Sequence, residues 1–297
     1  MAESEVPLIA GWELRVCTDV KHIGLLHHPR IPRSQTLAVE IARWLREQER
    51  TVWSGSAWDE QAVLDRITDF DLIITLGGDG TILRAARMAA RHGVLILGIN
   101  LGRVGFLAEL TPANWREKFP CLLEGQYWIE ERMMLHAEFW RRGEPQQSFE
   151  ALNDVVVSRG ELARIVRLPT YIDGGYFTTY VADGLIVATA TGSTAYALAV
   201  GGPILPPELK NILLIPIAPH LSMERAIVLS QGAQVEVEVS TDHRAILTID
   251  GQFHVELQHG DRVLVQASPY TSRFVRLQER MYFYQTLMER LRPVDVN

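Results

Sequence analysis

Residues 72–81 read Leu-Ile-Ile-Thr-Leu-Gly-Gly-Asp-Gly-Thr, an apolar run that ends in a glycine-rich turn. The run 72–76 predicts a buried strand, and residues 82–92 place apolar side chains at the spacing of one helix face. Gly93 follows as the expected C-terminal cap of that helix. The turn therefore lies at the carboxyl end of a strand, where open α/β sheets usually bind their ligands.

The rest of the first half repeats this alternation of strand and helix. Apolar runs at 23–26 and 94–99 predict further buried strands, and residues 37–46 carry apolar side chains at helical spacing. Repeated strand–helix–strand units are typical of a parallel sheet with helices on its faces. We therefore expect an α/β domain over residues 1–120.

The second half has the pattern of a mainly β domain, which we place at residues 121–275. Residues 234–240 alternate polar and apolar side chains, as half-buried strands do. Turns such as Asp250-Gly251 separate the apolar runs. Residues 276–297 are predicted to contain a C-terminal helix, at 278–291, that packs back on the first domain. The predicted strands lie at residues 155–157, 164–171, 235–239, 245–249, 263–265 and 274–277.

The overall charge and the cysteine content limit the classes of function. A formal net charge of -7 disfavours a general binder of nucleic acid or of anionic membranes, because those surfaces attract basic proteins. Residues 184–207 carry no charge, yet their glycines, hydroxyl residues and prolines favour a buried loop with short elements over a membrane helix. Cys17 and Cys121 are too few for a disulfide framework or a zinc site, so we expect a cytoplasmic protein.

The glycine-rich turn has the composition of a phosphate site. Gly77, Gly78 and Gly80 permit a phosphate to approach backbone N–H groups, and the N-terminus of the following helix favours negative charge. Thr81 is a candidate helix cap or phosphate ligand. Asp79 would repel a phosphate, so it fits a proton acceptor or a metal ligand, with a turn or cap residue as the alternative. The sequence contains no P-loop, and the turn is not a dinucleotide-binding glycine fingerprint.

Taken with four further segments, this turn resembles the NAD kinase family. The strand–Gly-Gly-Asp-Gly-Thr–helix unit alone is similar to a superfamily that also contains diacylglycerol kinases, sphingosine kinases and phosphofructokinases. The segments that narrow the resemblance, which covers roughly residues 70–255, are Asn-Leu-Gly-Arg-Val-Gly-Phe-Leu at 100–107, Ala-Leu-Asn-Asp-Val at 151–155, residues 183–203 with their Thr-Gly-Ser-Thr-Ala-Tyr core, and Pro-His-Leu-Ser at 219–222.

The resemblance implies a Rossmann-like first domain, a β-rich second domain, and transfer of a phosphoryl group to the 2′-hydroxyl of the adenosine ribose of NAD. It implies ATP or polyphosphate as the donor, a divalent cation, expected to be Mg²⁺ with unknown protein ligands, and a homodimer or homotetramer. Asp79 matches the catalytic base, and Gly77, Gly78, Gly80 and Thr81 match the donor-phosphate turn. The implied NAD-binding residues are Asp79, Gly80, Arg84, Asn153, Asp154, Arg164, Asp183, Thr191, Thr194, Ala195, Tyr196, Ala197, Leu198, Ala199 and Gln252.

Some of these positions also have a plain structural interpretation. Asn153 and Asp154 fit an Asx turn before a strand, Arg84 fits a solvated helix arginine, and Tyr196 fits the core. Asp183 opens the uncharged segment, where a buried carboxylate needs a partner. By resemblance Asp183 lies near the nicotinamide, and Arg164 lies near the pyrophosphate.

Two other functions stay open at this point. A lipid kinase of the same superfamily would need membrane-binding character, which the acidic balance does not offer. A dinucleotide sensor that has lost turnover would not need Asp79, which this sequence retains.

Overall fold

The computed structural model describes residues 20–102, 105–161, 164–220 and 223–291. Cys17 and parts of two segments that carry the family resemblance, residues 103–104 and 221–222, lie outside these ranges. Within them the strands form two sheets, one of ten strands and one of six. No helix in the described part of the chain is long and apolar enough to cross a membrane.

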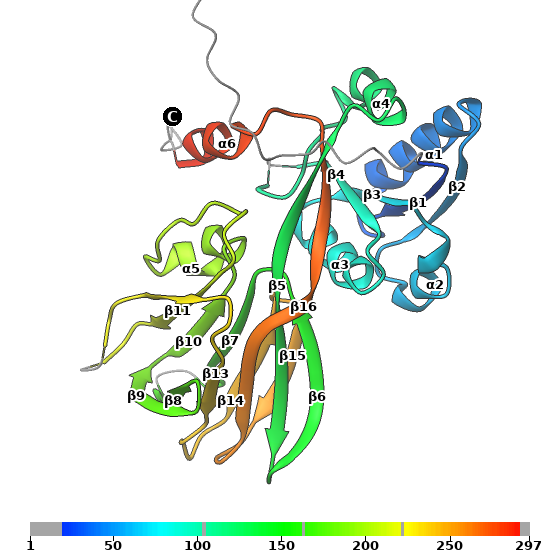
Figure 1. Ribbon diagram of the computed structural model, residues 1–297. Helices are drawn as coiled ribbons and strands as arrows, with labels where there is room; N and C mark the ends of the chain where they lie inside the picture. The colour runs from blue at the N-terminus through cyan, green and yellow to red at the C-terminus, as the bar shows by residue number, and fades with distance from the viewer. Residues whose placement is uncertain (1–19, 103–104, 162–163, 221–222, 292–297) are drawn as a thin grey trace, which may run out of the picture.

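A parallel sheet with the strand order β2-β1-β3-β4 forms the first half, which confirms the predicted α/β fold. Apolar side chains of α1 and α4 cover one face of this sheet, and those of α2 and α3 cover the other. Figure 1 shows these four helices gathered around the four strands. The elements are β1 (His22–His27), α1 (Pro32–Glu47), β2 (Thr51–Ser56), α2 (Glu60–Leu64), β3 (Leu72–Gly77), α3 (Asp79–Ala90), β4 (Leu95–Asn100) and α4 (Trp115–Leu123).

The glycine-rich turn follows β3, at the point where successive strand connections leave β1 in opposite directions along the sheet. From β1 the chain crosses to β2 on one side, and it returns to β3 on the other side of β1. The carboxyl ends of β1 and β3 therefore lie side by side, and the N–H of His28 bonds the carbonyl of Leu76 over 3.2 Å. Such a switch point leaves a crevice outside the strand ends, and ligands of open α/β sheets bind there.

The second half is a β sandwich. The six-stranded sheet, in the order β12-β11-β10-β7-β14-β15, packs against β5, β6, β8, β9, β13 and β16 of the larger sheet around one apolar core. Its strands are β5 (Trp128–Arg141), β6 (Glu144–Ala151), β7 (Asp154–Arg159), β8 (Val166–Ile172), β9 (Gly175–Ala182), β10 (Gly184–Ala188), β11 (Asn211–Ile217), β12 (Ile227–Ser230), β13 (Val235–Glu238), β14 (Ala245–Ile249), β15 (Phe253–Leu257) and β16 (Arg262–Arg276).

Strand β16 corrects the prediction of two separate strands at 263–265 and 274–277. It runs without a break from Arg262 to Arg276 and pairs with β5 along its length, with a register shift between Ala267 and Thr271. Residues 268–270 lie in this irregularity, and regular pairing with β5 resumes at Thr271 within the same strand. The end of β16 also pairs in parallel with β4, so a strand that begins in the sandwich joins the sheet of the first half.

Helix α6 (Tyr282–Leu291) forms within the range predicted for the C-terminal helix. Its Phe283 ring lies 6.4 Å from the ring of Phe106, which follows β4. The Tyr282 hydroxyl donates to Glu130 on β5 over 2.9 Å. The helix therefore contacts both the loop after β4 and the first strand of the second half.

Candidate active site

The glycine-rich turn joins β3 to α3 with close contacts inside the turn itself. Gly78 is the N-cap residue and α3 begins at Asp79, so neither Asp79 nor Thr81 caps the helix. A Cβ atom at Gly77 would lie 2.2 Å from Thr81 Oγ1, which explains why this position is a glycine. Thr81 Oγ1 is buried and has no hydrogen-bond partner among the described residues.

The Asp79 carboxylate has one oxygen engaged and one free. Its Oδ2 accepts a hydrogen bond from the backbone N–H of Phe106 over 2.9 Å. Its Oδ1 is buried without a partner in the described part of the chain. A Cβ atom at Gly105 would lie 1.7 Å from that Oδ1, so the glycine is what allows the loop after β4 to approach the carboxylate. This geometry orients Asp79 and leaves one oxygen able to accept a proton.

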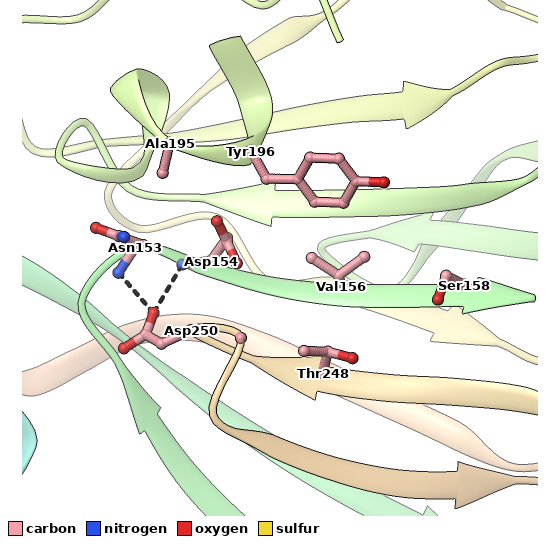
Figure 2. A pocket seen from close by; sticks show the side chains of 9 residues that line it. Asn153, Asp154, Val156, Ser158, Ala195, Tyr196, Thr248 and Asp250 are labelled. Carbon is pink, nitrogen blue, oxygen red and sulfur yellow. Dashed lines mark hydrogen bonds between the residues drawn. The ribbon is translucent and has the colours of Figure 1, made fainter. Parts of the chain in front are cut away.

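A cavity of about 350 Å³ opens on the second half of the protein. In Figure 2 the Tyr196 ring lies above β7, and the side chains of Asp154 and Val156 point toward it. Tyr196 is 46% exposed, so the ring covers the cavity and is not part of the core. The cavity is lined by Asn153, Asp154, Val156, Ser158, Ala195, Tyr196, Thr248, Asp250 and Gly251.

Asp250 holds the floor of this cavity together. It lies in the turn between β14 and β15 with a positive φ of 50°, and Gly251 follows with a φ of 66°. Its carboxylate accepts hydrogen bonds from the backbone N–H groups of Leu152, Asn153 and Asp154 over 2.9, 2.8 and 3.0 Å. Figure 2 shows the bonds from Asn153 and Asp154. The turn is therefore a fixed part of the site and not only a hairpin connection.

The glycine-, serine- and threonine-rich segment packs directly on the Asn153 backbone. The Thr189 hydroxyl donates to the carbonyl of Leu152 over 2.6 Å, and its N–H bonds the carbonyl of Asn153. A Cβ atom at Gly192 would lie 2.0 Å from the carbonyl oxygen of Asn153. The glycine therefore lets the short helix α5 (Tyr196–Ala199) start beside β7, which places Ala195 and Tyr196 at the cavity.

Most of the hydroxyl groups in this segment bind its own backbone. Ser193 Oγ donates to the carbonyl of Ala190 over 2.6 Å, and Thr194 Oγ1 donates to that of Thr191 over 3.0 Å. Thr191 is buried, and its Oγ1 accepts from Arg132 over 3.5 Å. In α5, Ala197 is buried in the core under the helix, whereas Leu198 is half-buried and Ala199 is exposed.

Two buried carboxyl groups lie next to each other at the cavity floor. Burial, and then the charge of Asp250, raises the pKa of Asp154 from 3.8 to about 7. Burial also raises the pKa of Asp250, against the three backbone N–H groups and Arg87, which lower it. Asp154 therefore changes its charge near neutral pH, where most aspartates are fully ionised.

Gln252 connects the glycine-rich turn to the cavity. It follows Gly251 in the chain, and its Nε2 donates to the carbonyl of Gly80 over 2.9 Å. This contact thus joins the glycine-rich turn of the first half to the turn before β15 in the second half. The amide of Gln252 is used within the protein and does not line the cavity.

The remaining predicted residues lie away from the cavity lining. Arg84 pairs with Glu60 and stacks over Trp58 at 4.9 Å, so it is not a solvated arginine. Asp183 has the partner that it was expected to need, since Arg159 Nη2 lies 3.0 Å from its Oδ2. Arg164 is exposed on the segment before β8.

Several residues of the site escaped the sequence prediction. Val156 and Ser158 line the cavity because they alternate with Asp154 along β7, and this period of two was the available signal. Thr248 pairs with Val156 across the two strands. Gly105 carried no signal beyond its place in the segment 100–107. No group of three or more His, Cys, Asp or Glu side chains in the described part of the chain is arranged to hold a metal ion.

Comparison with known families covers both halves of the chain. A model of the ATP-NAD kinase N-terminal domain matches residues 48–127. A model of the ATP-NAD kinase C-terminal domain matches residues 152–277. The two matched ranges contain the glycine-rich turn and the whole cavity lining.

Individual relatives agree with the family matches. The NAD kinase of Chloroflexus aurantiacus is 41% identical over 273 residues, which are 92% of this chain and 99% of that protein. The NAD kinase of Natranaerobius thermophilus is 44% identical over 222 residues, 74% of this chain and 77% of that one.

Solved structures show the same fold. An NAD kinase from Archaeoglobus fulgidus in complex with ATP has a TM-score of 0.74 at 28% identity, over 90% of this chain and 98% of that chain. Yeast NADH kinase complexed with NADH has a TM-score of 0.79 over 94% of this chain and 91% of that one. At 23% identity this second likeness concerns the fold alone.

Proposed function

The chain belongs to the ATP-NAD kinase family, and from this premise we propose that it transfers the terminal phosphoryl group of ATP to NAD. The acceptor atom is the 2′-hydroxyl of the adenosine ribose, and the product is NADP. The observation that carries the proposal is the Asp79 carboxylate, whose Oδ2 is hydrogen-bonded to Phe106 and whose Oδ1 has no partner among the described residues. Asp79 lies on the glycine-rich turn, and Gln252, next to the cavity floor, is hydrogen-bonded to that turn.

In the proposed reaction Asp79 acts as the general base. The 2′-oxygen attacks the terminal phosphorus, the bond from that phosphorus to the bridging oxygen breaks, and ADP leaves with the electron pair. Asp79 Oδ1 takes the proton of the hydroxyl, while Oδ2 stays bonded to Phe106 and keeps the carboxylate oriented. General-base help of this kind contributes roughly 10²–10⁴-fold to a rate.

The cavity is the proposed site of NAD. Asn153 and Asp154 offer an amide and a carboxyl group to the adenosine portion, and the Tyr196 ring offers a face for stacking. The small side chain of Ala195, which also lines the cavity, lets the dinucleotide lie close to the backbone there. Asp183 lies immediately before β10, and Gly184, the first residue of β10, pairs with Ser158. Ser158 lies at the other end of the cavity lining from Asn153, so we assign Asp183 to the nicotinamide side. Arg164 is assigned to the pyrophosphate. Thr191, Thr194, Ala197, Leu198 and Ala199 support this wall of the site.

The donor is proposed to bind at the glycine-rich turn. Gly77, Gly78 and Gly80 leave the backbone open to phosphate, the N-terminus of α3 favours negative charge, and Thr81 Oγ1 is unpaired within the described residues. A bound Mg²⁺ would neutralise charge on the triphosphate. Mg²⁺ typically takes one or two protein carboxylates and completes its shell with phosphates and water.

A coupled assay with purified protein, ATP, Mg²⁺ and NAD tests this function. We expect NADP to form in the presence of NAD and no phosphorylated lipid to form when diacylglycerol replaces it. A protein that binds NAD in calorimetry but forms no NADP would be a sensor, and the proposal would fail. Replacing ATP with polyphosphate in the same assay determines the donor.

Two properties of the whole protein belong to the same proposal. We propose a homodimer or homotetramer, as the family resemblance implies, and light scattering of the purified chain tests it. We also propose a cytoplasmic location, in keeping with a chain of only two cysteines. Fractionation of the source cells with antibody detection would test the location.

A further inference from the structure

Arg87 lies two helical turns beyond Asp79 on α3, and its guanidinium joins both halves of the protein. Its side chain is only 11% exposed. Its Nη2 lies 2.6 Å from Glu60 Oε1, on the helix that follows β2. Its Nη1 donates to Gln252 Oε1 over 2.7 Å, and the guanidinium lies 4.3 Å from the centroid of the Phe253 ring. One planar cation thus holds an acid from the first half and the turn of the second half.

Gln252 uses both ends of its amide in this arrangement. Its Oε1 accepts from Arg87, and its Nε2 donates to the carbonyl of Gly80 in the glycine-rich turn. The two residues before it in the chain, Asp250 and Gly251, line the cavity. The contacts therefore run without a gap from Glu60 through Arg87 and Gln252 to the donor turn and to the cavity floor.

We propose that Arg87 is a positioning residue, which fixes the cavity relative to the donor turn through Gln252. This inference rests on the proposed function, because it assigns the donor to the turn and the acceptor to the cavity. Only a guanidinium presents several donors in one plane, so it can hold Glu60 and Gln252 at the same time. The carboxylate of Glu60, which also pairs with Arg84, compensates the charge of Arg87. A buried guanidinium without such a partner would destabilise the fold.

The role matters because phosphoryl transfer depends on alignment. A displacement of about 1 Å between reacting groups costs roughly 100-fold in rate even when both substrates still bind. Arg87 donates its side-chain hydrogen bonds to Glu60 and Gln252, and neither of these residues lines the cavity. Its loss is therefore expected to change turnover and to leave the affinity for each substrate close to its original value.

The test compares Arg87→Met, Gln252→Ala and the double variant with Arg91→Met as the matched control. Arg91 is the C-cap residue of the same helix, pairs with Glu150 over 3.3 Å and stacks on Tyr270, so it contacts other elements than the Gln252 turn. We measure kcat, KM for ATP and NAD, and the Kd of NAD by calorimetry. Folding is checked by thermal unfolding.

We expect each single variant to lose at least about tenfold in kcat at saturating substrate, and the double variant to lose no more than the worse single variant. For Arg87→Met, KM and Kd should stay within about threefold of their original values. Arg91→Met is expected to keep its turnover. Unchanged kcat in Arg87→Met, an equal loss in Arg91→Met, or a Kd for NAD that rises with Arg87→Met would overturn the proposal. If Arg87→Met does not fold, the kcat of Gln252→Ala at saturating substrate decides alone, and an unchanged value overturns the proposal. Absence of NADP formation by the unaltered protein contradicts the proposed function instead.

Discussion

The carboxylate of Asp250 accepts a hydrogen bond from the backbone N–H of Asp154 over 3.0 Å, so two buried acidic residues lie next to each other. Asp250 receives two further backbone N–H groups, from Leu152 and Asn153. These bonds stabilise its negative charge. Asp154 has burial and the neighbouring charge acting against its ionisation, and its pKa rises to about 7. The pair therefore makes the protein sensitive to pH at the cavity floor.

We predict that Asp154 makes the unliganded protein lose stability as the pH rises toward 8. The pKa of Asp154 is higher in the folded state, at about 7, than the ordinary value of 3.8. The stability gained from binding this proton is complete below about pH 4 and is lost as the pH rises through about 7. Thermal unfolding of the original protein and of Asp154→Asn at about pH 5 and pH 8 measures the effect, since other groups cancel in the difference. A difference that does not change with pH would contradict the assignment.

Replacing Asp79 with asparagine should abolish most of the turnover. The amide oxygen of the new side chain would still accept the N–H of Phe106, so the side chain keeps its position, but it cannot take a proton. We expect kcat to fall by roughly 10²–10⁴-fold while the Kd for NAD changes little. Steady-state kinetics and calorimetry on Asp79→Asn measure both quantities. Turnover equal to that of the original protein would rule out the base.

The substitution Gly105→Ala should displace the Asp79 carboxylate by a steric clash from the loop after β4. The new Cβ atom would lie 1.7 Å from Asp79 Oδ1, so either the carboxylate or the loop must move. We expect kcat to fall by at least about tenfold, because a small misplacement of a reacting group is costly. Gly232→Ala is the control, since a Cβ atom there meets nothing within 4 Å. Equal turnover of the two variants would show that the contact with Gly105 is unimportant.

The first half of the fold was predictable because its signals are local. The apolar run of β3, the turn and the helical spacing of α3 are neighbours in the chain, and each signal favours the same structure. The alternation of side chains along β7 was an equally local signal, although only Asp154 of this strand was predicted to belong to the site. By contrast, the bond from Arg87 to Gln252 joins positions 165 residues apart, and no periodicity reports such a contact.

The division of the chain at 120 and 275 stays a prediction for a related reason. Strand β16 was expected to be two separate strands, yet it is continuous and pairs with β4 of the first half. A break in an apolar pattern is the same in sequence whether the strand ends or only shifts its register. Asn153, Asp154, Ala195 and Tyr196 were chosen by resemblance, and the fold brings them to one cavity.

A second buried acid, Glu130, should show the opposite dependence on pH from Asp154. Its Oε2 accepts from Arg132 over 2.9 Å and from Arg276 over 2.7 Å, and Tyr282 donates to its Oε1 over 2.9 Å. Burial alone would raise the pKa of Glu130, but the two arginines outweigh it and hold the pKa at about 2. Strand β5, the end of β16 and helix α6 all meet at this one carboxylate.

We predict that Glu130→Gln destabilises the protein by about 3–5 kcal/mol near neutral pH, because it leaves the buried Arg132 without its carboxylate partner and Arg276 with Glu109 alone. The folded pKa lies below the ordinary 4.5, so the contribution of Glu130 is present above about pH 5 and is lost as the pH falls toward 2. The difference in unfolding free energy between the two proteins should therefore shrink in acid. Glu236→Gln is the control, since its partner Arg262 is 56% exposed and such pairs contribute about 0–1 kcal/mol. A Glu130→Gln variant no less stable than this control would show that the buried network does not hold the three elements together.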